Sequence, residues 1–370
     1  MNRFRNYSII VTLLVIFGGG LLIGLWLNRR PATIRVEPAS SYEPLETGEA
    51  VVMRVYKALS PTVVNIVTSS LALNFWMQWE PRGGQGTGFV IDEDGNILTN
   101  NHVIANASSL DVTFIGGKKV RARLVGRDPV SDLAVVKVDP FSGMAVAPMG
   151  DSDKLSVGQR VIAIGNPFGL QHTVTAGFIS ALNRDIAVGD HTMMGLVQTD
   201  AAINLGNSGG PLIDSRGEVI AVNTALYTPT GGFIGIGLAV PVNQAKKIAA
   251  QIIKFGRAIY PWLGIKSSMN TAQLGLPTKG ILIMELAPGS PAANAGLRGG
   301  DQLAFFGGRP ILWGGDIITS IDGTPTPTLD EFNNVLYQKK IGESVRLEIV
   351  RGKQEMTVDM KTVSDPGTRQ

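Results

Sequence analysis

The middle of the chain is a succession of short hydrophobic runs that are rich in β-branched residues and separated by turn residues. Roughly a dozen of these runs follow one another with no helical pattern between them, among them GTGFVID, LAVVKV, RVIAIGN and GEVIAVNTAL. Pairs such as Asp94-Gly95 and Gly116-Gly117 mark turns between neighbouring runs. Short strands at this spacing are typical of antiparallel barrels and sandwiches, so the pattern predicts a mainly β domain.

Two amphipathic helical patterns lie at the ends of this β-rich block. The first covers residues 49–59 and is ended by Pro61, and the second covers residues 242–256, with Gly256 at its end. We therefore predict a single domain over residues 49–257.

The pattern changes from residue 259 onward. Strand-like segments such as WLGI, GILIMEL, DIITSIDG and SVRLEIVRG alternate with two short helical patterns. Ser290 caps the first helix, and Thr328 and Glu331 form a capping box at the start of the second. These features predict a separate small α+β domain over residues 259–362.

The N-terminal segment is the part of the sequence that bears on location. No residue is charged between Arg5 and Arg29, and YSIIVTLLVIFGGGLLIGLWL would span roughly 30 Å as a helix, the hydrocarbon thickness of a bilayer. A short tail over residues 1–6, a transmembrane anchor over 7–28 and a linker over 29–48 are therefore predicted. A cleaved signal peptide is the alternative, because the start is basic. We favour the anchor, since the run is long and no small-x-small cleavage site follows it.

Composition excludes several classes of function. The net charge of +3 is small and scattered, which argues against binding to nucleic acid. The chain has no cysteine, so it has no disulfide, zinc–thiolate site or cysteine nucleophile. With three histidines besides, no metal cluster is plausible, and we expect neither a metal nor a cofactor.

The segment NLGNSGGPL, residues 204–212, places one serine among turn-forming residues. It could be an ordinary turn, or Gly206 and Gly209 could let backbone N–H groups converge beside a nucleophilic Ser208. A serine hydroxyl needs a base, and His102, at the end of the strand-like GNILTNNHV, is a candidate. Asp132, directly before LAVVKV, is a candidate for the carboxylate that orients that base. Taken alone, His102 could be structural and Asp132 could cap a turn.

Taken together, LTNNHVI, SDLAVVKV and DAAINLGNSGGPL, in the order His, Asp, Ser, resemble the HtrA/Deg family of serine proteases. AIGNPFG and VNTAL match further stretches of that family, and the resemblance covers residues 49–362. It implies a mainly β fold, a chymotrypsin-like double antiparallel β-barrel followed by a small PDZ domain. With the apolar segment in front, it also implies a single-pass membrane protein whose catalytic domain is extracytoplasmic, and a homotrimer.

The resemblance also implies roles for individual residues. Ser208 would attack the peptide carbonyl, His102 would accept and return the proton, and Asp132 would hold His102. The oxyanion hole would be formed by the N–H groups of Gly206 and Ser208, and Asn207 between them would either fill the turn or hold its shape. The substrate contacts implied are a strand-pairing segment and the base of an uncharged, apolar specificity pocket: Asn223, Thr224 and Ala225, and Ala202 and Ile203.

In the C-terminal domain, YPWLGI and the segments after it resemble a bacterial type of PDZ domain. The loop that binds a C-terminal carboxylate would be Trp262, Leu263, Gly264 and Ile265, with the helix at 328–340 as the opposite wall. The insertion QLAFFGGRPILWGGD departs from the pattern. It could bury Phe305, Phe306 and Trp313 on the PDZ core, or it could contact the protease domain or a membrane surface.

Two classes of function follow. The first is a membrane-anchored serine endopeptidase that cleaves unfolded or regulatory proteins in protein quality control or stress signalling, with C-terminal peptides bound at the PDZ domain. The second is a peptide-binding chaperone or scaffold in which proteolysis is minor. The complete set of His102, Asp132 and Ser208 favours the first, because a pure binder needs none of the three. Occupancy of the PDZ domain could regulate the protease or simply tether its substrates.

Overall fold

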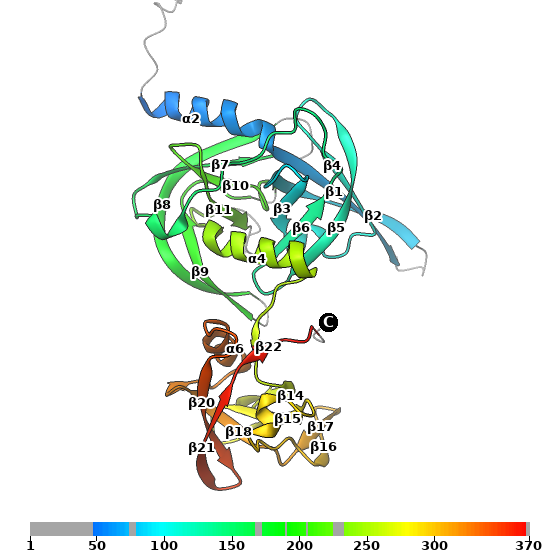
Figure 1. The fold of residues 1–370 in the computed structure, drawn as a ribbon, viewed down its shortest axis with the longest axis vertical. Helices are drawn as coiled ribbons and strands as arrows, with labels where there is room; N and C mark the ends of the chain where they lie inside the picture. Colours follow the sequence, from blue (N-terminus) through cyan, green and yellow to red (C-terminus); the bar gives the residue numbers. More distant parts are fainter. Residues whose placement is uncertain are drawn as a thin grey trace, which may run out of the picture. The chain divides into compact units, whose positions relative to one another are not determined.

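The structure is a computed structural model, and it describes residues 47–73, 79–166, 172–188, 191–204, 206–224 and 233–367. From Glu49 onward the chain forms one compact unit that contains two β-barrels and a smaller α+β domain (Figure 1). The predicted anchor over residues 7–28 lies outside the described residues. Within the described part, no helix is both long enough and apolar enough to cross a membrane.

The first barrel is a closed antiparallel sheet with the strand order β1-β2-β3-β6-β5-β4. Its β2–β3 hairpin turns at Gly95, whose φ of 84° suits glycine, and the side chain of Asp92 accepts a hydrogen bond from the N–H of Asn96. Its strands are β1 Val63–Leu73, β2 Trp79–Val90, β3 Asn96–Asn100, β4 Ser109–Thr113, β5 Lys119–Asp128 and β6 Leu133–Lys137.

The second barrel is also closed, with the order β10-β11-β12-β9-β8-β7. Its strands are β7 Arg160–Gly165, β8 Thr173–Val188, β9 His191–Thr199, β10 Pro211–Asp214, β11 Val219–Thr224 and β12 Gly237–Pro241. Strands β8 and β9 are longer than the hydrophobic runs predicted. Their pairing shifts register three times, and Asn183 adopts a φ of 55° within the second shift, so the alternation that marks a strand is interrupted there.

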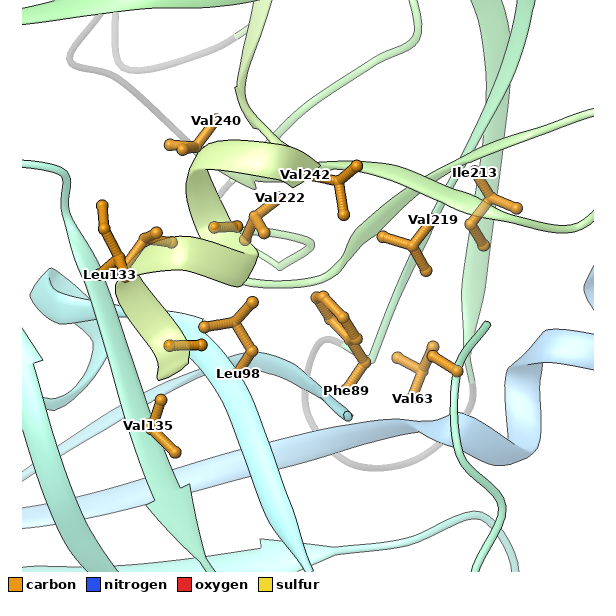
Figure 2. Packing of buried hydrophobic residues seen from close by; sticks show 14 of the residues in the cluster. Val63, Phe89, Leu98, Leu133, Val135, Ile213, Val219, Val222, Val240 and Val242 are labelled. Carbon is orange, nitrogen blue, oxygen red and sulfur yellow. The ribbon is translucent and has the colours of Figure 1, made fainter. Parts of the chain in front are cut away.

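One hydrophobic core joins the two barrels. Figure 2 shows Phe89 and Leu98 of the first barrel among Val222 and Ile213 of the second, all fully buried. Helices from both ends of the domain complete this core, through Val55 of α2 (Thr47–Leu59) and several residues of α4 (Val242–Phe255). The loops between the barrels are therefore held against a shared, rigid interior.

The C-terminal domain has a separate core. Its main sheet has the order β14-β15-β18-β20-β21, and it buries Phe332 and Leu336 of α6 (Leu329–Tyr337) together with residues of the sheet. The predicted capping box of Thr328 and Glu331 is present, and Ser290 caps α5 (Pro291–Asn294). The strands are β13 Pro261–Trp262, β14 Ile265–Asn270, β15 Ile281–Leu286, β18 Ile317–Ile321, β19 Thr324–Pro325, β20 Ser344–Arg351, β21 Gln354–Lys361 and β22 Val363–Ser364.

The insertion in this domain is a two-stranded ribbon, β16 (Gln302–Phe306) paired with β17 (Arg309–Trp313). Ile311 is the side chain that it buries, at 5% exposed, whereas Phe305 is 72% and Phe306 44% exposed. Of the two interpretations of the insertion, burial of its aromatic residues on the PDZ core is therefore wrong for both phenylalanines. The register explains this for Phe305, which pairs with Pro310 and so lies on the face opposite to Ile311. Phe306 shares the face of Ile311 but lies at the end of the ribbon, where it pairs with Arg309.

Candidate active site

The sequence pattern predicted that His102 ends a strand, and this prediction is wrong. Strand β3 ends at Asn100, and His102 lies in the short helix α3 (Asn101–Ile104) that follows directly. Two hydrogen bonds stabilise this change of direction. The N–H of Asn101 and the side-chain amide of Asn100 both donate to the carbonyl of Asp132, at 3.0 and 2.9 Å. These bonds bring the turn after β3 to the loop before β6.

The side chains of His102 and Asp132 are paired at this point. Asp132 Oδ1 accepts from the backbone N–H of His102 at 2.9 Å, and Oδ2 lies 2.6 Å from His102 Nδ1. A carboxylate can only accept, so the proton of the neutral imidazole resides on Nδ1 and Nε2 is left as an acceptor. His102 is 41% exposed and Asp132 13%, so the base is open to a substrate while its partner is sheltered.

Thr224 and Asn100 are functional candidates that the sequence did not assign to this pair. The hydroxyl of Thr224 donates to Asp132 Oδ2 at 3.2 Å, and it accepts a hydrogen bond from the side-chain amide of Asn100 at 2.9 Å. The expectation for Thr224 concerns pairing of its backbone with the substrate, whereas its side chain supports Asp132. No local pattern could have indicated this, because residues 100, 132 and 224 meet only in the folded chain.

Ser208 lies in a tight turn before β10. It is 1% exposed, and its Oγ donates to the carbonyl of Asn204 at 3.3 Å. Gly209, with a φ of 81°, must be glycine, because a Cβ there would lie 2.2 Å from the carbonyl oxygen of Thr87. Among the described residues, no hydrogen bond joins Ser208 Oγ to His102. The structure thus brings His102 and Asp132 into direct contact and leaves the hydroxyl turned to its own loop.

The side chain of Asn207 holds this turn in shape. Its Oδ1 accepts from the N–H of Asn204 at 2.9 Å, and its Nδ2 donates to the carbonyl of Ala202 at 2.9 Å. Of the two interpretations of Asn207, support of the turn therefore agrees with its contacts. Within the described part of the chain, the backbone N–H of Ser208 donates to no other group, as an oxyanion-hole donor requires.

The residues expected to contact substrate lie beside this turn, with differences. Ala202 is half-buried and Ile203 is buried, and neither side chain carries a charge. Asn223 is fully buried and its N–H donates to the carbonyl of Gly210 at 2.9 Å, so it supports the turn and does not face a substrate strand. Ala225 lies outside the described residues.

Asp128 forms a second polar cluster four residues before Asp132. Its Oδ2 accepts from the hydroxyl of Tyr260 at 2.6 Å and from the N–H of Ser131 at 3.2 Å, and the Ser131 hydroxyl also contacts it. Burial raises the pKa of Asp128 above its ordinary value, because the hydrogen bonds offset the loss of water only in part. The cluster ties the loop that carries Asp132 to the segment after α4.

The expected carboxylate-binding loop lies between β13 and β14. Gly264 has a φ of 104°, and a Cβ there would lie 2.1 Å from Cβ of Ser290. The carbonyls of Leu263 and Gly264 accept from the N–H groups of Ala292 and Ala287, both at 2.8 Å. The N–H groups of Leu263 and Gly264 donate to no other described group, so they are available to a bound carboxylate.

The side chains of the same loop belong to the domain core. Trp262, Leu263 and Ile265 are buried, and the indole N–H of Trp262 donates to the carbonyl of Ile265 at 3.2 Å. Their side chains therefore fix the loop, and recognition of a peptide end would fall to the backbone. Across the described part of the chain, no cluster of His, Asp or Glu could hold a metal ion.

Comparisons with known proteins cover both domains. A trypsin-like peptidase domain matches residues 86–222 and a PDZ domain matches residues 261–362. The chain is 39% identical over 346 residues to Protease Do-like 1, chloroplastic, of Arabidopsis thaliana, which covers 90% of this chain and 78% of that relative. It is 38% identical over 295 residues to the putative serine protease HhoA of Synechocystis sp., covering 75% and 70% of the two chains.

A solved structure extends the likeness to the fold. The HtrA-type protease AlgW with decapeptide is similar with a TM-score of 0.62 and 31% identity, over 85% of this chain and 99% of that one. The two barrels account for little more than half of this chain, so a match of this length includes the C-terminal domain as well.

Proposed function

Because the chain belongs to the HtrA/Deg family of serine proteases, with a trypsin-like peptidase domain followed by a PDZ domain, we propose that Ser208, His102 and Asp132 carry out its peptide-bond cleavage. The observation that carries the assignment is the two-point hold of Asp132 on His102, at 2.9 and 2.6 Å. That hold fixes both the ring orientation and the tautomer that a general base for serine needs.

The reaction follows from this geometry. Rotation about the Cα–Cβ bond of Ser208 moves Oγ from the carbonyl of Asn204 toward His102 Nε2, which accepts its proton as Oγ attacks the substrate carbonyl. The N–H groups of Gly206 and Ser208 stabilise the oxyanion. His102 then returns the proton to the leaving amine, and water hydrolyses the acyl-enzyme by the same path in reverse.

Substrate preference is set by the pocket beside the turn. Ala202 and Ile203 bring no charge to it, so we expect an apolar side chain before the cleaved bond, and poor cleavage after lysine or arginine. The substrates proposed are unfolded or regulatory proteins, in quality control or stress signalling. A panel of short peptides that differ only in that residue measures the preference.

Ser208→Ala provides the test of the catalytic assignment. Cleavage of an unfolded protein such as casein should fall by several orders of magnitude, while casein binding is largely retained. Titration with a serine-reactive fluorophosphonate should label one serine per chain in the unchanged protein and none in the variant. Undiminished cleavage by Ser208→Ala would end the assignment. If the protein protected unfolded proteins from aggregation but was not labelled by the fluorophosphonate, the chaperone alternative would be favoured.

Binding of C-terminal peptides at residues 262–265 is proposed to regulate the protease. In support, Asp330 in the first turn of α6, the opposite wall of that groove, accepts from the N–H of Thr192 in β9 at 2.8 Å and also contacts its hydroxyl. Strand β9 ends at Thr199, directly before the segment that holds the expected pocket residues Ala202 and Ile203. A peptide that shifts α6 can therefore change the balance between active and inactive forms of the site, and a tenfold change needs about 1.4 kcal/mol of differential affinity.

A short chromogenic substrate that cannot reach the PDZ groove separates regulation from tethering. Regulation predicts that saturating C-terminal peptide changes kcat or KM for this substrate, and that deletion of residues 259–362 also does. If neither treatment changes kcat or KM, the role of the PDZ domain is to tether substrates.

Membrane attachment and assembly are proposed from the sequence. The uncharged segment over residues 7–28 would hold the catalytic domain at an extracytoplasmic membrane face, and the family resemblance supports a homotrimer. Alkaline carbonate extraction should leave full-length protein in the membrane pellet, and light scattering should give the mass of three chains. Protein in the soluble wash would instead favour a cleaved signal peptide.

A further inference from the structure

Thr87 in β2 of the first barrel lies directly against the turn of the second barrel that carries Ser208. It is fully buried, and no sequence pattern indicated a role for it. We propose that Thr87 is a positioning residue that holds the nucleophile turn, defined as residues 206–208, in the shape needed to stabilise the oxyanion. The inference rests on the catalytic role proposed above for Ser208.

The direction of each hydrogen bond at Thr87 follows from the fact that its hydroxyl has a single proton to donate. The N–H of Asn166 donates to Thr87 Oγ1 at 2.9 Å, so the hydroxyl acts as an acceptor there. Its single proton is then committed to the carbonyl of Gly206, 2.7 Å away. The backbone N–H of Thr87 donates to the carbonyl of Ser208 at 3.0 Å. One residue of the first barrel therefore anchors two carbonyls of the nucleophile turn.

These bonds fix the peptide planes on both sides of the nucleophile. The carbonyls of Gly206 and Ser208 are held by Thr87, and the carbonyl between them, that of Asn207, accepts from the N–H of Gly210 at 3.0 Å. Because the N–H of Ser208 shares a plane with the Asn207 carbonyl, it points the opposite way. Three consecutive planes are thus anchored, and the Ser208 N–H needed for the oxyanion hole is directed away from Gly210.

Thr87 can act as an anchor because it is itself held rigidly. Its carbonyl accepts from the hydroxyl of Thr99 at 2.7 Å, and it is paired with Asn65 across β1 and β2. The side-chain amide of Asn65 donates to the carbonyl of Asn166 at 2.8 Å, which fixes the donor to the Thr87 hydroxyl as well. Gly210 packs against Thr87, because a Cβ at position 210 would lie 2.5 Å from the carbonyl oxygen of Ile164 and 2.8 Å from Cγ2 of Thr87.

Loss of the hydroxyl should therefore affect the transition state more than substrate binding. The carbonyl of Gly206 and the N–H of Asn166 would both lose a buried partner, and the plane that follows Gly206 would be free to rotate because glycine permits it. A smaller fraction of molecules would then present the oxyanion-hole donors correctly. Thr87 has no described hydrogen bond to Ala202 or Ile203, so these residues would bind the substrate as before.

The experiment compares Thr87→Val with Thr87→Ser in the full-length protein, on a short chromogenic peptide. The valine variant should lower kcat about 10- to 100-fold with KM within roughly threefold, and should weaken binding of a peptide aldehyde that mimics the tetrahedral intermediate. The serine variant, which keeps the hydroxyl, should stay within about threefold of the original kcat.

Thr62→Val is the matched control for stability. Its hydroxyl is also buried and donates to a carbonyl, that of Leu59 at 2.8 Å, but it lies directly before β1 and has no described hydrogen bond to the nucleophile turn. It should lower the melting temperature without lowering kcat. If Thr87→Val does not fold, Thr87→Ala and Thr87→Ser form a second pair that differs only in the hydroxyl.

Three results overturn the inference. The first is an undiminished kcat in Thr87→Val, and the second is a Thr87→Ser variant that is as slow as Thr87→Val. The third is a loss of kcat in both Thr87→Val and Thr62→Val that is in proportion to the loss of melting temperature. Failure of the catalytic assignment is distinguishable, because in that case the unchanged protein itself would not react with the fluorophosphonate and Ser208→Ala would change nothing.

Discussion

Asp132 accepts hydrogen bonds from His102 through both carboxylate oxygens, and its backbone has a φ of 55°. Asparagine tolerates this backbone conformation, so Asp132→Asn should change the chemistry without straining the loop. One of its two side-chain positions becomes a donor, and His102 then loses either its orientation or its Nδ1 proton. We expect kcat to fall about 10³- to 10⁴-fold with little change in melting temperature.

Asp139→Asn is a suitable control for Asp132→Asn. Asp139 is exposed and lies just after the same strand, β6, so its substitution should leave kcat unchanged. Equal activity of the two variants on a short peptide substrate would contradict the role given to Asp132.

His172 makes the stability of the protease domain depend on pH. Its Nε2 lies 2.9 Å from the carbonyl of Val63, and burial lowers its pKa below the ordinary value of 6.5. The unfolded chain therefore takes up this proton at a higher pH than the folded chain, so stability is present above about pH 6.5 and is lost as the pH falls below it.

His172→Gln tests this pH dependence, because glutamine can still donate to Val63 but does not titrate. Urea unfolding at about pH 7.5 and about pH 5.5 should show a larger loss of stability in the original protein than in the variant. An identical loss in both would mean that His172 is not responsible.

Single residues show what the sequence can and cannot predict about the site. Ser208, His102 and Asp132 could be proposed because each stands in a distinctive local pattern, such as a serine among glycines. The supporting contacts of Thr224 and Thr87 could not, since they join residues 92 and 119 positions apart. Such contacts depend on how the two barrels meet, and local periodicity carries no information about that.

At the scale of elements, the prediction succeeded where a local pattern has one physical meaning. Helix α4 ends at Gly256, whose φ of 75° is the left-handed conformation that glycine accepts, and the box of Thr328 and Glu331 starts α6 as expected. The prediction failed where tertiary contacts determine the local structure. The hydrogen bonds to Asp132 turn the chain after β3 into the helix of His102, and bulges extend β8 beyond its hydrophobic run.

The ribbon of β16 and β17 allows a test at this scale. Phe305 is 72% exposed and Ile311 is 5% exposed, although the two lie one cross-strand pair apart. Phe305→Ala should change the free energy of unfolding by less than about 0.5 kcal/mol, whereas Ile311→Ala should cost about 2 kcal/mol or more. Urea unfolding followed by tryptophan fluorescence measures both. A large loss for Phe305→Ala would mean that its ring is covered in solution.

At the scale of the whole molecule, the distribution of buried side chains divides the chain into two cooperative units. One core, which includes Phe89 and Val222, is shared by both barrels, and each barrel also has a smaller core of its own. The core around Phe332 lies within the PDZ domain. Polar contacts such as that of Tyr260 with Asp128, at 2.6 Å, connect the units. A hydrogen bond of this kind contributes on the order of 1 kcal/mol net, much less than either core.

Two calorimetric transitions are therefore expected from the full-length protein, with the two barrels melting together in one of them. Phe89→Ala should lower the barrel transition, and Phe332→Ala the PDZ transition, each by a loss of about 3–5 kcal/mol, because both rings are buried in their own core. Each variant serves as the control for the other. A substitution in one core should change the stability of the other unit by no more than the free energy of the polar contacts between them. If both substitutions shifted one common transition, the polar contacts would be far stronger than their chemistry predicts. Separate melting of the two barrels would instead show that the core around Phe89 does not hold them together.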